Sequence, residues 1–293
     1  MERIRTIFAS LIIITLLIAG MALLPEETQA QDQTVKLGYV NWAGTVAETQ
    51  VAKVVLEDIM DYNVETTMVG VGPIYAALAE GDIDAFMGVW LPLTHKNYVE
   101  RYQEEIIKTG PNYKGAKIGL VVPEYVDIDS VEELNKYRDK FDGKITGIEP
   151  GAGVMKATRE AIKEYDLDFE LLTSSGPAMV GSLESAIKKE EWIVVTGWRP
   201  HYKFAKFDLK FLEDPENVYG SKENVYTFHH PQLAQKHPEV VSFFHDFRMT
   251  TDEVGQVMAW IEDGMEKEAA AKKWVEENKE KARGWTNPVV VSE

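Results

Sequence analysis

The sequence contains no cysteine, which excludes disulfide bonds, thiolate metal sites and cysteine nucleophiles. The same absence excludes the lipid-modified cysteine that anchors a bacterial lipoprotein. Basic residues are also scarce: 31 Lys and Arg stand against 48 Asp and Glu, so the formal net charge is -17. A surface of this sign repels nucleic acids and anionic membranes, and we expect neither as a partner.

Signatures of catalytic and metal sites are absent as well. The sequence has no Gly-x-Ser-x-Gly, no His-Glu-x-x-His and no pair of histidines at metal-binding spacing. The adjacent His229 and His230 have no third ligand nearby in the sequence. We therefore predict no catalytic residue, no metal and no cofactor. The alternative that stays open is a secreted hydrolase that uses carboxylates in an aromatic cleft, although most acidic residues lie beside lysines at helical spacing, as in 266–281.

Long hydrophobic runs are limited to one, at residues 7–24. Arg3 and Arg5 precede it, Pro25 ends it, and Ala30 provides a small residue for cleavage. This order is typical of a secretory signal peptide, predicted here at 1–30 with the mature chain beginning at Gln31. An uncleaved membrane anchor is the alternative, because 18 residues can just span a bilayer.

The remaining chain alternates between short β-rich runs and amphipathic segments, which predicts an α/β fold with mostly parallel sheets. The expected strands are 34–40, 64–69, 82–89, 117–123, 144–148, 169–173, 192–197, 209–212 and 224–228. The expected helices are 45–60, 73–79, 97–107, 130 onward with a capping box at Ser130, 153–165, 177–189, 238–247, 251–261 and 266–283. Residues 289–291 read as a tail.

Two similar β-α-β-α-β units in this pattern predict two lobes joined by two crossover strands. We place lobe 1 at 31–121 plus 226–293, and lobe 2 at 122–225. Ligands of parallel sheets bind beyond the carboxyl ends of the strands, so a site is expected in the cleft between the lobes.

Three tryptophans occupy such strand ends. Trp42, Trp90 and Trp198 each close an apolar or β-branched run and are followed by Gly or Pro within two residues. A single tryptophan of this kind is most simply a packing residue, and we interpret Trp192, Trp260, Trp274 and Trp285 in that way. Three together predict an aromatic cage. Indole faces attract large, weakly hydrated cations by about 0.5–2 kcal/mol per contact, which suits a quaternary ammonium group.

Two further features predict a partner for a carboxylate. The turn Pro150-Gly151-Ala152-Gly153-Val154 leads from a strand into a helix, where free backbone N–H groups and the helix dipole favour an anion. It lacks the residues of a nucleotide-binding loop. His95, five residues after Trp90, could donate a further hydrogen bond. A cage for methyl groups together with donors for a carboxylate describes a small zwitterion such as glycine betaine.

At this point the sequence resembles a known family, the glycine betaine and proline betaine binding proteins of bacterial osmoprotectant ABC importers. The resemblance spans about Val35 to Trp285. The matching blocks are Gly38-Tyr39-Val40-Asn41-Trp42, Gly88-Val89-Trp90-Leu91-Pro92-Leu93-Thr94-His95, Glu149-Pro150-Gly151-Ala152-Gly153-Val154-Met155, Thr196-Gly197-Trp198-Arg199-Pro200-His201 and the stretch Lys210 to Tyr219.

This resemblance implies a two-lobed periplasmic binding protein of type II that closes on its ligand and delivers it to membrane permease subunits. It implies that Trp42, Trp90 and Trp198 surround the trimethylammonium group. It implies further that the Gly153 and Val154 amides and His95 bind the carboxylate. A free periplasmic monomer is expected, since lipid-anchored members carry a cysteine.

The sequence departs from its relatives at two places near the expected site. Choline-binding relatives have an acidic residue soon after the first tryptophan, whereas Ala43 and Gly44 follow Trp42 here. Arg199 stands where small polar residues are common. Choline, carnitine and dimethylsulfoniopropionate remain alternative ligands.

Overall fold

The computed structural model describes residues 33–286. The predicted signal peptide and the tail at 289–291 lie outside these residues. Along the described part, no helix has the length and apolar character that a membrane crossing requires.

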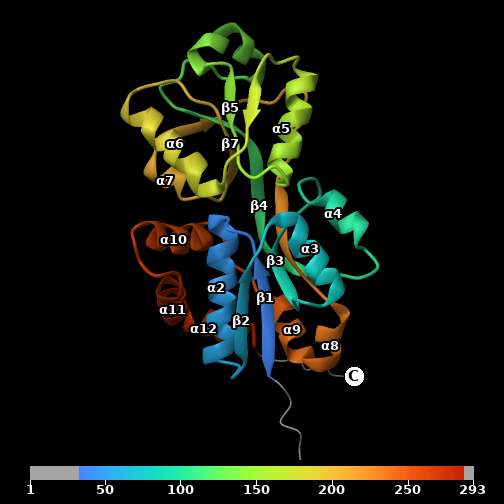
Figure 1. Ribbon diagram of the computed structural model, residues 1–293. Helices are drawn as coiled ribbons and strands as arrows, with labels where there is room; N and C mark the ends of the chain where they lie inside the picture. Colours follow the sequence, from blue (N-terminus) through green and yellow to red (C-terminus); the bar gives the residue numbers. More distant parts are fainter. Residues whose placement is uncertain (1–32, 287–293) are drawn as a thin grey trace, which may run out of the picture. The chain divides into compact units, whose positions relative to one another are not determined.

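The secondary structure alternates as the sequence predicts (Figure 1). The first elements are β1 (Thr34–Tyr39), α2 (Ala43–Asp58), β2 (Asn63–Met68), α3 (Val71–Glu80), β3 (Ala85–Leu91), α4 (Lys96–Arg101) and β4 (Ile107–Pro123). They are followed by the 3₁₀ helix η2 (Val131–Phe141), β5 (Lys144–Thr146), α5 (Gly153–Glu164), β6 (Glu170–Leu172), α6 (Gly176–Lys188), β7 (Val195–Arg199), α7 (Lys203–Lys206) and β8 (Leu209–Phe211). The last are β9 (Glu223–His229), α8 (Pro231–Lys236), α9 (Pro238–Asp246), α10 (Thr251–Glu262), α11 (Lys267–Glu277) and α12 (Lys279–Gly284).

The strands form two sheets that share β4. Sheet A has the order β2-β1-β3-β9-β4, in which β2, β1 and β3 run parallel and β9 pairs antiparallel with both β3 and β4. Sheet B contains the second half of β4 with β7, β8, β5 and β6, and the β7-β5-β6 part is parallel. The parallel βαβ units on both sides confirm the predicted α/β architecture.

Strand β4 is where the chain passes from one sheet to the other. Ala116 still pairs with β9 of sheet A, and Lys117 already pairs with Arg199 of sheet B. On the return, the chain leaves β8 after Phe211 and enters sheet A at Glu223. The chain thus passes between the sheets a few residues before each of the predicted lobe boundaries, at 121 and 226. Those boundaries remain a proposal.

Helices cover both faces of sheet A around β1–β3. Figure 1 shows α2, α10 and α11 on one side of β1–β3, and α3, α8 and α9 on the other. The buried residues of α2 include Val51, Val54 and Val55, whose spacing gives the helix an apolar stripe. Positioning α2 this firmly matters because its N-cap residue is Trp42.

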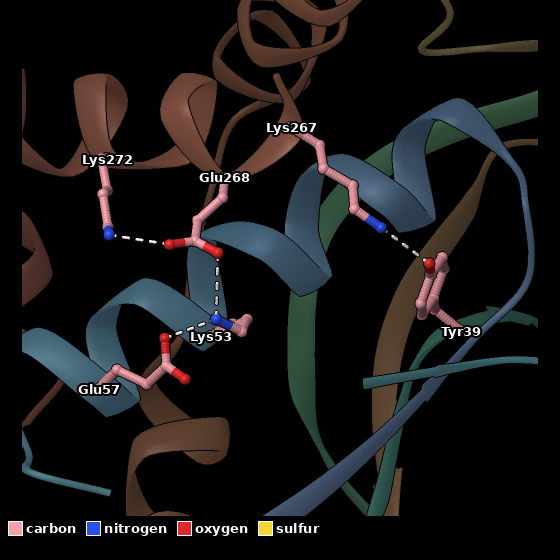
Figure 2. A network of polar contacts seen from close by, with 6 residues as sticks. All are labelled: Tyr39, Lys53, Glu57, Lys267, Glu268 and Lys272. Atoms are coloured by element: carbon pink, nitrogen blue, oxygen red, sulfur yellow. Dashed lines mark hydrogen bonds and ion pairs between the residues drawn. The ribbon is translucent and has the colours of Figure 1, made fainter. Parts of the chain in front are cut away.

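Helix α11 is tied to α2 by an ion-pair network (Figure 2). Glu268 accepts from Lys272 within its own helix at 2.8 Å and pairs with Lys53 of α2 at 3.3 Å. Lys53 also pairs with Glu57 at 2.6 Å. One residue earlier in α11, Lys267 donates to the hydroxyl of Tyr39 at 3.0 Å, at the end of β1. The C-terminal helices therefore support the segment that leads into Trp42.

Several predicted element bounds are wrong. The helix predicted at 97–107 ends at Arg101, and Ile107 begins β4, which is much longer than the predicted strand 117–123. Pairing with β9 extends β4 through Gly110 and Pro111, with register shifts on either side of Pro111. The helix predicted at 266–283 is broken into α11 and α12 at Asn278. The capping box at Ser130 is present, but it begins a 3₁₀ helix.

Candidate functional site

A cavity lies where β4 passes between the two sheets. Its walls bring together all the residues that the sequence singled out for ligand binding. The lining residues are Trp42, Gly44, Thr45, Trp90, Thr94, His95, Tyr113, Ile118, Ile148, Ala152, Gly153, Val154 and Trp198. The lining is mostly apolar with a few polar groups, which is the composition typical of small-molecule sites.

The topology explains why three distant tryptophans meet here. Trp42 follows β1, and Trp90 lies near the end of β3, the parallel neighbour of β1, so both reach the same edge of sheet A. Trp198 lies near the end of β7, opposite Ile118 of β4. Each of the three indoles is only 6–7% exposed. The structure therefore brings the three strand ends together, as the sequence predicts.

The turn after β3 is fixed by backbone and carboxylate contacts. The His95 amide donates to the Trp90 carbonyl at 3.0 Å, and the Trp90 amide donates to Nδ1 of His95 at 3.0 Å. From β9, Glu223 accepts from the amides of Leu93 at 2.7 Å and Thr94 at 2.9 Å, and also from the Thr94 hydroxyl. This turn holds the Trp90 backbone and the His95 ring in one fixed arrangement.

His95 is a neutral hydrogen-bond donor in this site. Only 1% of the residue is exposed, and burial lowers the pKa of His95 to about 3, although the Gly88 backbone opposes part of the shift. Since Nδ1 accepts from the Trp90 amide, the ring proton belongs on Nε2. The ring also stacks on Trp42, with centroids 5.6 Å apart and an interplanar angle of 21°. His95 thus supports one wall of the cavity as a neutral imidazole.

Trp198 is backed by a buried lysine. Lys203 is fully buried, its Nζ lies 4.4 Å from the centroid of the Trp198 ring, and this nitrogen has no hydrogen-bond partner among the described residues. Burial, with a smaller contribution from the charge of Arg199, lowers the pKa of Lys203 well below its usual value. Arg199 lies over Phe204, with its guanidinium carbon 4.1 Å from the ring centroid, and does not line the cavity.

The start of α5 supplies free amides. Ala152 is the N-cap residue and has no side-chain cap, and among the described residues the amides of Gly153 and Val154 have no acceptor. Residue 153 has no room for a side chain, because a Cβ built there would lie 2.2 Å from the carbonyl oxygen of Thr94. The helix start therefore contacts the turn after β3 through backbone atoms, and its dipole favours a negative group at this point.

The lining carries no formal charge, because its residues are uncharged side chains and a neutral histidine. An acidic residue nevertheless lies beside one of the three tryptophans, because Glu149 accepts a hydrogen bond from Nε1 of Trp42. A second acid, Glu48, is fully buried behind the cavity and accepts from Asn112 at 2.9 Å. Burial raises the pKa of Glu48 well above its usual value, although the hydrogen bond from Asn112 opposes part of the shift.

The four tryptophans predicted to be packing residues lie away from the cavity wall. Trp274 stacks on Trp285 with centroids 5.7 Å apart, and both are buried. Trp192 packs on Phe141 at 5.3 Å, although it precedes β7 rather than starting it. Trp260 lies under Lys273 at 4.1 Å. Among the residues that the structure describes, no group of three or more potential ligands is arranged for a metal ion.

Comparison with known proteins identifies the family. Residues 33–277 match the family described as the substrate binding domain of ABC-type glycine betaine transport system. The chain belongs to this family. Its members are transporter substrate-binding domains rather than a family of enzymes.

Individual relatives agree with this assignment. The glycine betaine/carnitine transport binding protein GbuC of Listeria monocytogenes is 47% identical over 154 residues, which cover 52% of this chain and 51% of GbuC. The chain thus matches about half the length of this relative. Lactococcal OpuAC, solved closed with glycine betaine, has 38% identity and a TM-score of 0.83, covering 87% of this chain and all of that chain. A glycine betaine/L-proline-binding protein (ProX) of Borrelia burgdorferi also has 38% identity and a TM-score of 0.83, covering 87% and 97%.

Some contributors to the site were missed by the sequence analysis. Tyr113 comes from the first half of β4, which was not predicted to be a strand, whereas Ile118 lies in the predicted strand 117–123 but was not singled out for the site. Glu149 and Glu223 act on residues more than a hundred positions away along the chain. A signal for Glu149 did exist, because it lies immediately before the glycine-rich turn.

Proposed function

We propose that this protein captures glycine betaine, or a closely similar quaternary-ammonium zwitterion, and delivers it to the permease of an ABC importer. One observation carries the proposal. Three indoles from three strand ends line the same cavity as the N-terminus of α5, which has no side-chain cap. Family membership and the likeness to lactococcal OpuAC, which was solved with glycine betaine, support it.

The ammonium half of the ligand would lie among Trp42, Trp90 and Trp198. Each good cation–π contact contributes about 0.5–2 kcal/mol, so three can supply a large part of the ~8 kcal/mol that micromolar binding requires. The apolar methyl groups are also removed from water by the buried aromatic walls. An ammonium that could donate hydrogen bonds would find no carboxylate on the cavity wall to accept them.

The carboxylate half would accept hydrogen bonds from the amides of Gly153 and Val154 and from Nε2 of His95. These donors come from α5 and from the turn after β3. A ligand that bridges them stabilises the closed arrangement in which both halves of the site meet, by its differential affinity for that state. Binding would thereby create the closed form that the permease receives.

An uncharged cavity favours a ligand without net charge. Choline brings a positive charge and no carboxylate, so its charge would be buried without a direct partner on the wall, and the donors of α5 would stay unpaired. Glu149, behind Trp42, offers only indirect compensation. We therefore rank glycine betaine above choline and keep carnitine and dimethylsulfoniopropionate as carboxylated alternatives.

The hydrolase alternative is less well supported. No pair of carboxylates lies on the cavity wall among the described residues, while the nearby Glu149 is hydrogen-bonded to Trp42.

The substrate-binding proteins of ABC importers work outside the cytoplasmic membrane. The predicted cleavage after Ala30 would release this protein into the periplasm, where we expect a monomer without catalytic activity.

The test is a calorimetric and fluorescence titration with glycine betaine, carnitine, dimethylsulfoniopropionate and choline. We expect saturable binding of glycine betaine in the micromolar range and weaker binding of choline. Replacement of Trp42, Trp90 or Trp198 by Ala should each reduce affinity by about tenfold or more, since each removes a cation–π contact and its buried area. Unchanged affinity in two of the three variants would rule out the cage.

A further inference from the structure

The loop between β5 and α5, residues 147–152, contacts sheet A elements at several points. Glu149 accepts from the indole Nε1 of Trp42, which follows β1. The hydroxyl of Tyr98 in α4 donates to the carbonyl of Gly151 at 3.0 Å. A Cβ built at Gly151 would lie 3.0 Å from Cγ1 of Val71 in α3, so the backbone itself is closely packed there. The loop is thus the part of sheet B that meets the wall formed by sheet A.

Among these contacts, only the one from Glu149 involves a tryptophan of the cavity. Trp42 has two neighbours that fix its ring: His95 stacks on its face, and Glu149 accepts from its edge. His95 belongs to the same sheet as Trp42, so that stacking needs no second sheet. The Glu149 contact, by contrast, exists only when the β5–α5 loop lies against the end of β1.

We propose that Glu149 is a positioning residue, which fixes the Trp42 indole in the closed site and slows release of the ligand. The proposal rests on the proposed function for the identity of the ligand. An indole N–H bonded to a carboxylate is a charge-assisted hydrogen bond, about twice as strong as a neutral one. The negative charge at the ring edge also favours a cation on the ring face. Glu149 therefore contributes a bond between the sheets and an electrostatic benefit to the bound ammonium.

This assignment explains how a glutamate can lie close to a site for a carboxylated ligand. A carboxylate next to a site for a carboxylated ligand would be unfavourable if it lined the cavity. Glu149 does not line it, because its side chain is directed to the nitrogen edge of Trp42. The residue therefore acts through Trp42 and not by touching the ligand.

The kinetic test uses stopped-flow binding of glycine betaine to Glu149→Ala, Glu149→Gln, Trp42→Phe and Glu149→Ala combined with Trp42→Phe. We expect Glu149→Ala to accelerate dissociation by about tenfold to a hundredfold, the effect of a lost hydrogen bond to a charged group. Association should change little, because the contact forms only after the sheets meet. Glu149→Gln keeps an acceptor without the charge, and it should rescue part of the loss.

The double variant separates the proposed contact from a general effect on folding. Trp42→Phe keeps an aromatic ring but has no N–H to donate, so adding Glu149→Ala to it should accelerate dissociation by no more than about twofold. Glu170→Ala, in the exposed edge strand β6, removes the same charge from sheet B and should bind like the original protein. Dissociation unchanged in Glu149→Ala, or accelerated equally in both backgrounds, would overturn the proposal.

A second measurement observes the indole directly in protein saturated with glycine betaine. Nitrogen-15 labelling of the seven tryptophans gives one indole N–H resonance each, and Trp42→Phe identifies the signal of Trp42 by its loss. We expect this proton to resonate downfield of the ordinary indole range in the saturated protein and to return to it in saturated Glu149→Ala. A signal that does not move in Glu149→Ala would refute the Glu149 contact. Absence of binding of any betaine in the calorimetric titration would instead refute the proposed ligand.

Discussion

At the residue scale, His95 links protonation to stability. Its pKa is lowered to about 3 by burial, while an exposed histidine of the unfolded chain keeps an ordinary value near 6.5. Between these two values the unfolded state holds a proton that the folded state does not. Lowering the pH through this window therefore favours unfolding by about 1.4 kcal/mol per pH unit, and above the upper value the contribution vanishes.

Urea unfolding of the original protein and of His95→Asn measures this contribution. From about pH 7.5 to about pH 5.5, the original protein should lose about 1 kcal/mol more than the variant. The pKa values of His201 and His229 are lowered in the same direction, chiefly by burial, but both proteins share them. Equal losses in the two proteins would mean that His95 does not resist protonation in the folded state.

The residues of the site differ in how far the sequence predicts them. The three tryptophans, His95 and the Gly153 turn are visible because each follows a strand, and parallel strands end at one edge. Glu149 and Glu223 are not visible in this way, because their partners, Trp42 and Thr94, are set by the approach of segments far apart in the chain. Local pattern can place a residue at a strand end, but it cannot show which carboxylate arrives beside it.

At the scale of an element, the start of α5 is the most sensitive feature of the site. Gly153→Ala would place a methyl group 2.2 Å from the Thr94 carbonyl oxygen, which forces α5 away from the turn after β3. The nearest atoms include the Thr94 backbone, so the clash is relieved only if the two segments move apart. We expect the glycine betaine affinity, measured by calorimetric titration, to fall by more than tenfold.

The matched control for this change is Gly181→Ala in α6, where an added Cβ would meet nothing within 4 Å. This variant should keep its full affinity. If Gly153→Ala also keeps its affinity, then the close approach of α5 to the Thr94 carbonyl is not required for binding.

Element boundaries show where local pattern fails. The alternation of strand and helix is correct throughout both βαβ units, because hydrophobic periodicity is strong there. The first half of β4 was not predicted, since Gly110 and Pro111 oppose strand formation locally. Pairing with β9 nevertheless recruits these residues, at the cost of register shifts around Pro111. Tertiary pairing thus overrides local propensity at the strand that carries Tyr113 and Ile118 to the cavity.

At the scale of the whole molecule, three of the seven tryptophans line the cavity and the other four pack elsewhere. Trp42 and Trp274 have nearly the same low exposure, 7% and 1%, so burial alone does not distinguish them. Their surroundings do. Trp42 faces the cavity and its polar neighbours, whereas Trp274 in α11 stacks on Trp285 within the hydrophobic core, on the helices that support α2.

This division makes opposite predictions for the two residues. Trp274→Ala should lower the free energy of unfolding by about 3–5 kcal/mol, as is usual when a core aromatic is truncated, and the protein that remains folded should bind glycine betaine with nearly the original affinity. Trp42→Ala should lose affinity and much less stability, because the cavity beside it is already open space. Urea unfolding and calorimetric titration of both variants decide the matter. If Trp274→Ala loses affinity while remaining fully folded, the C-terminal helices contribute to the site directly and not only through their support of α2.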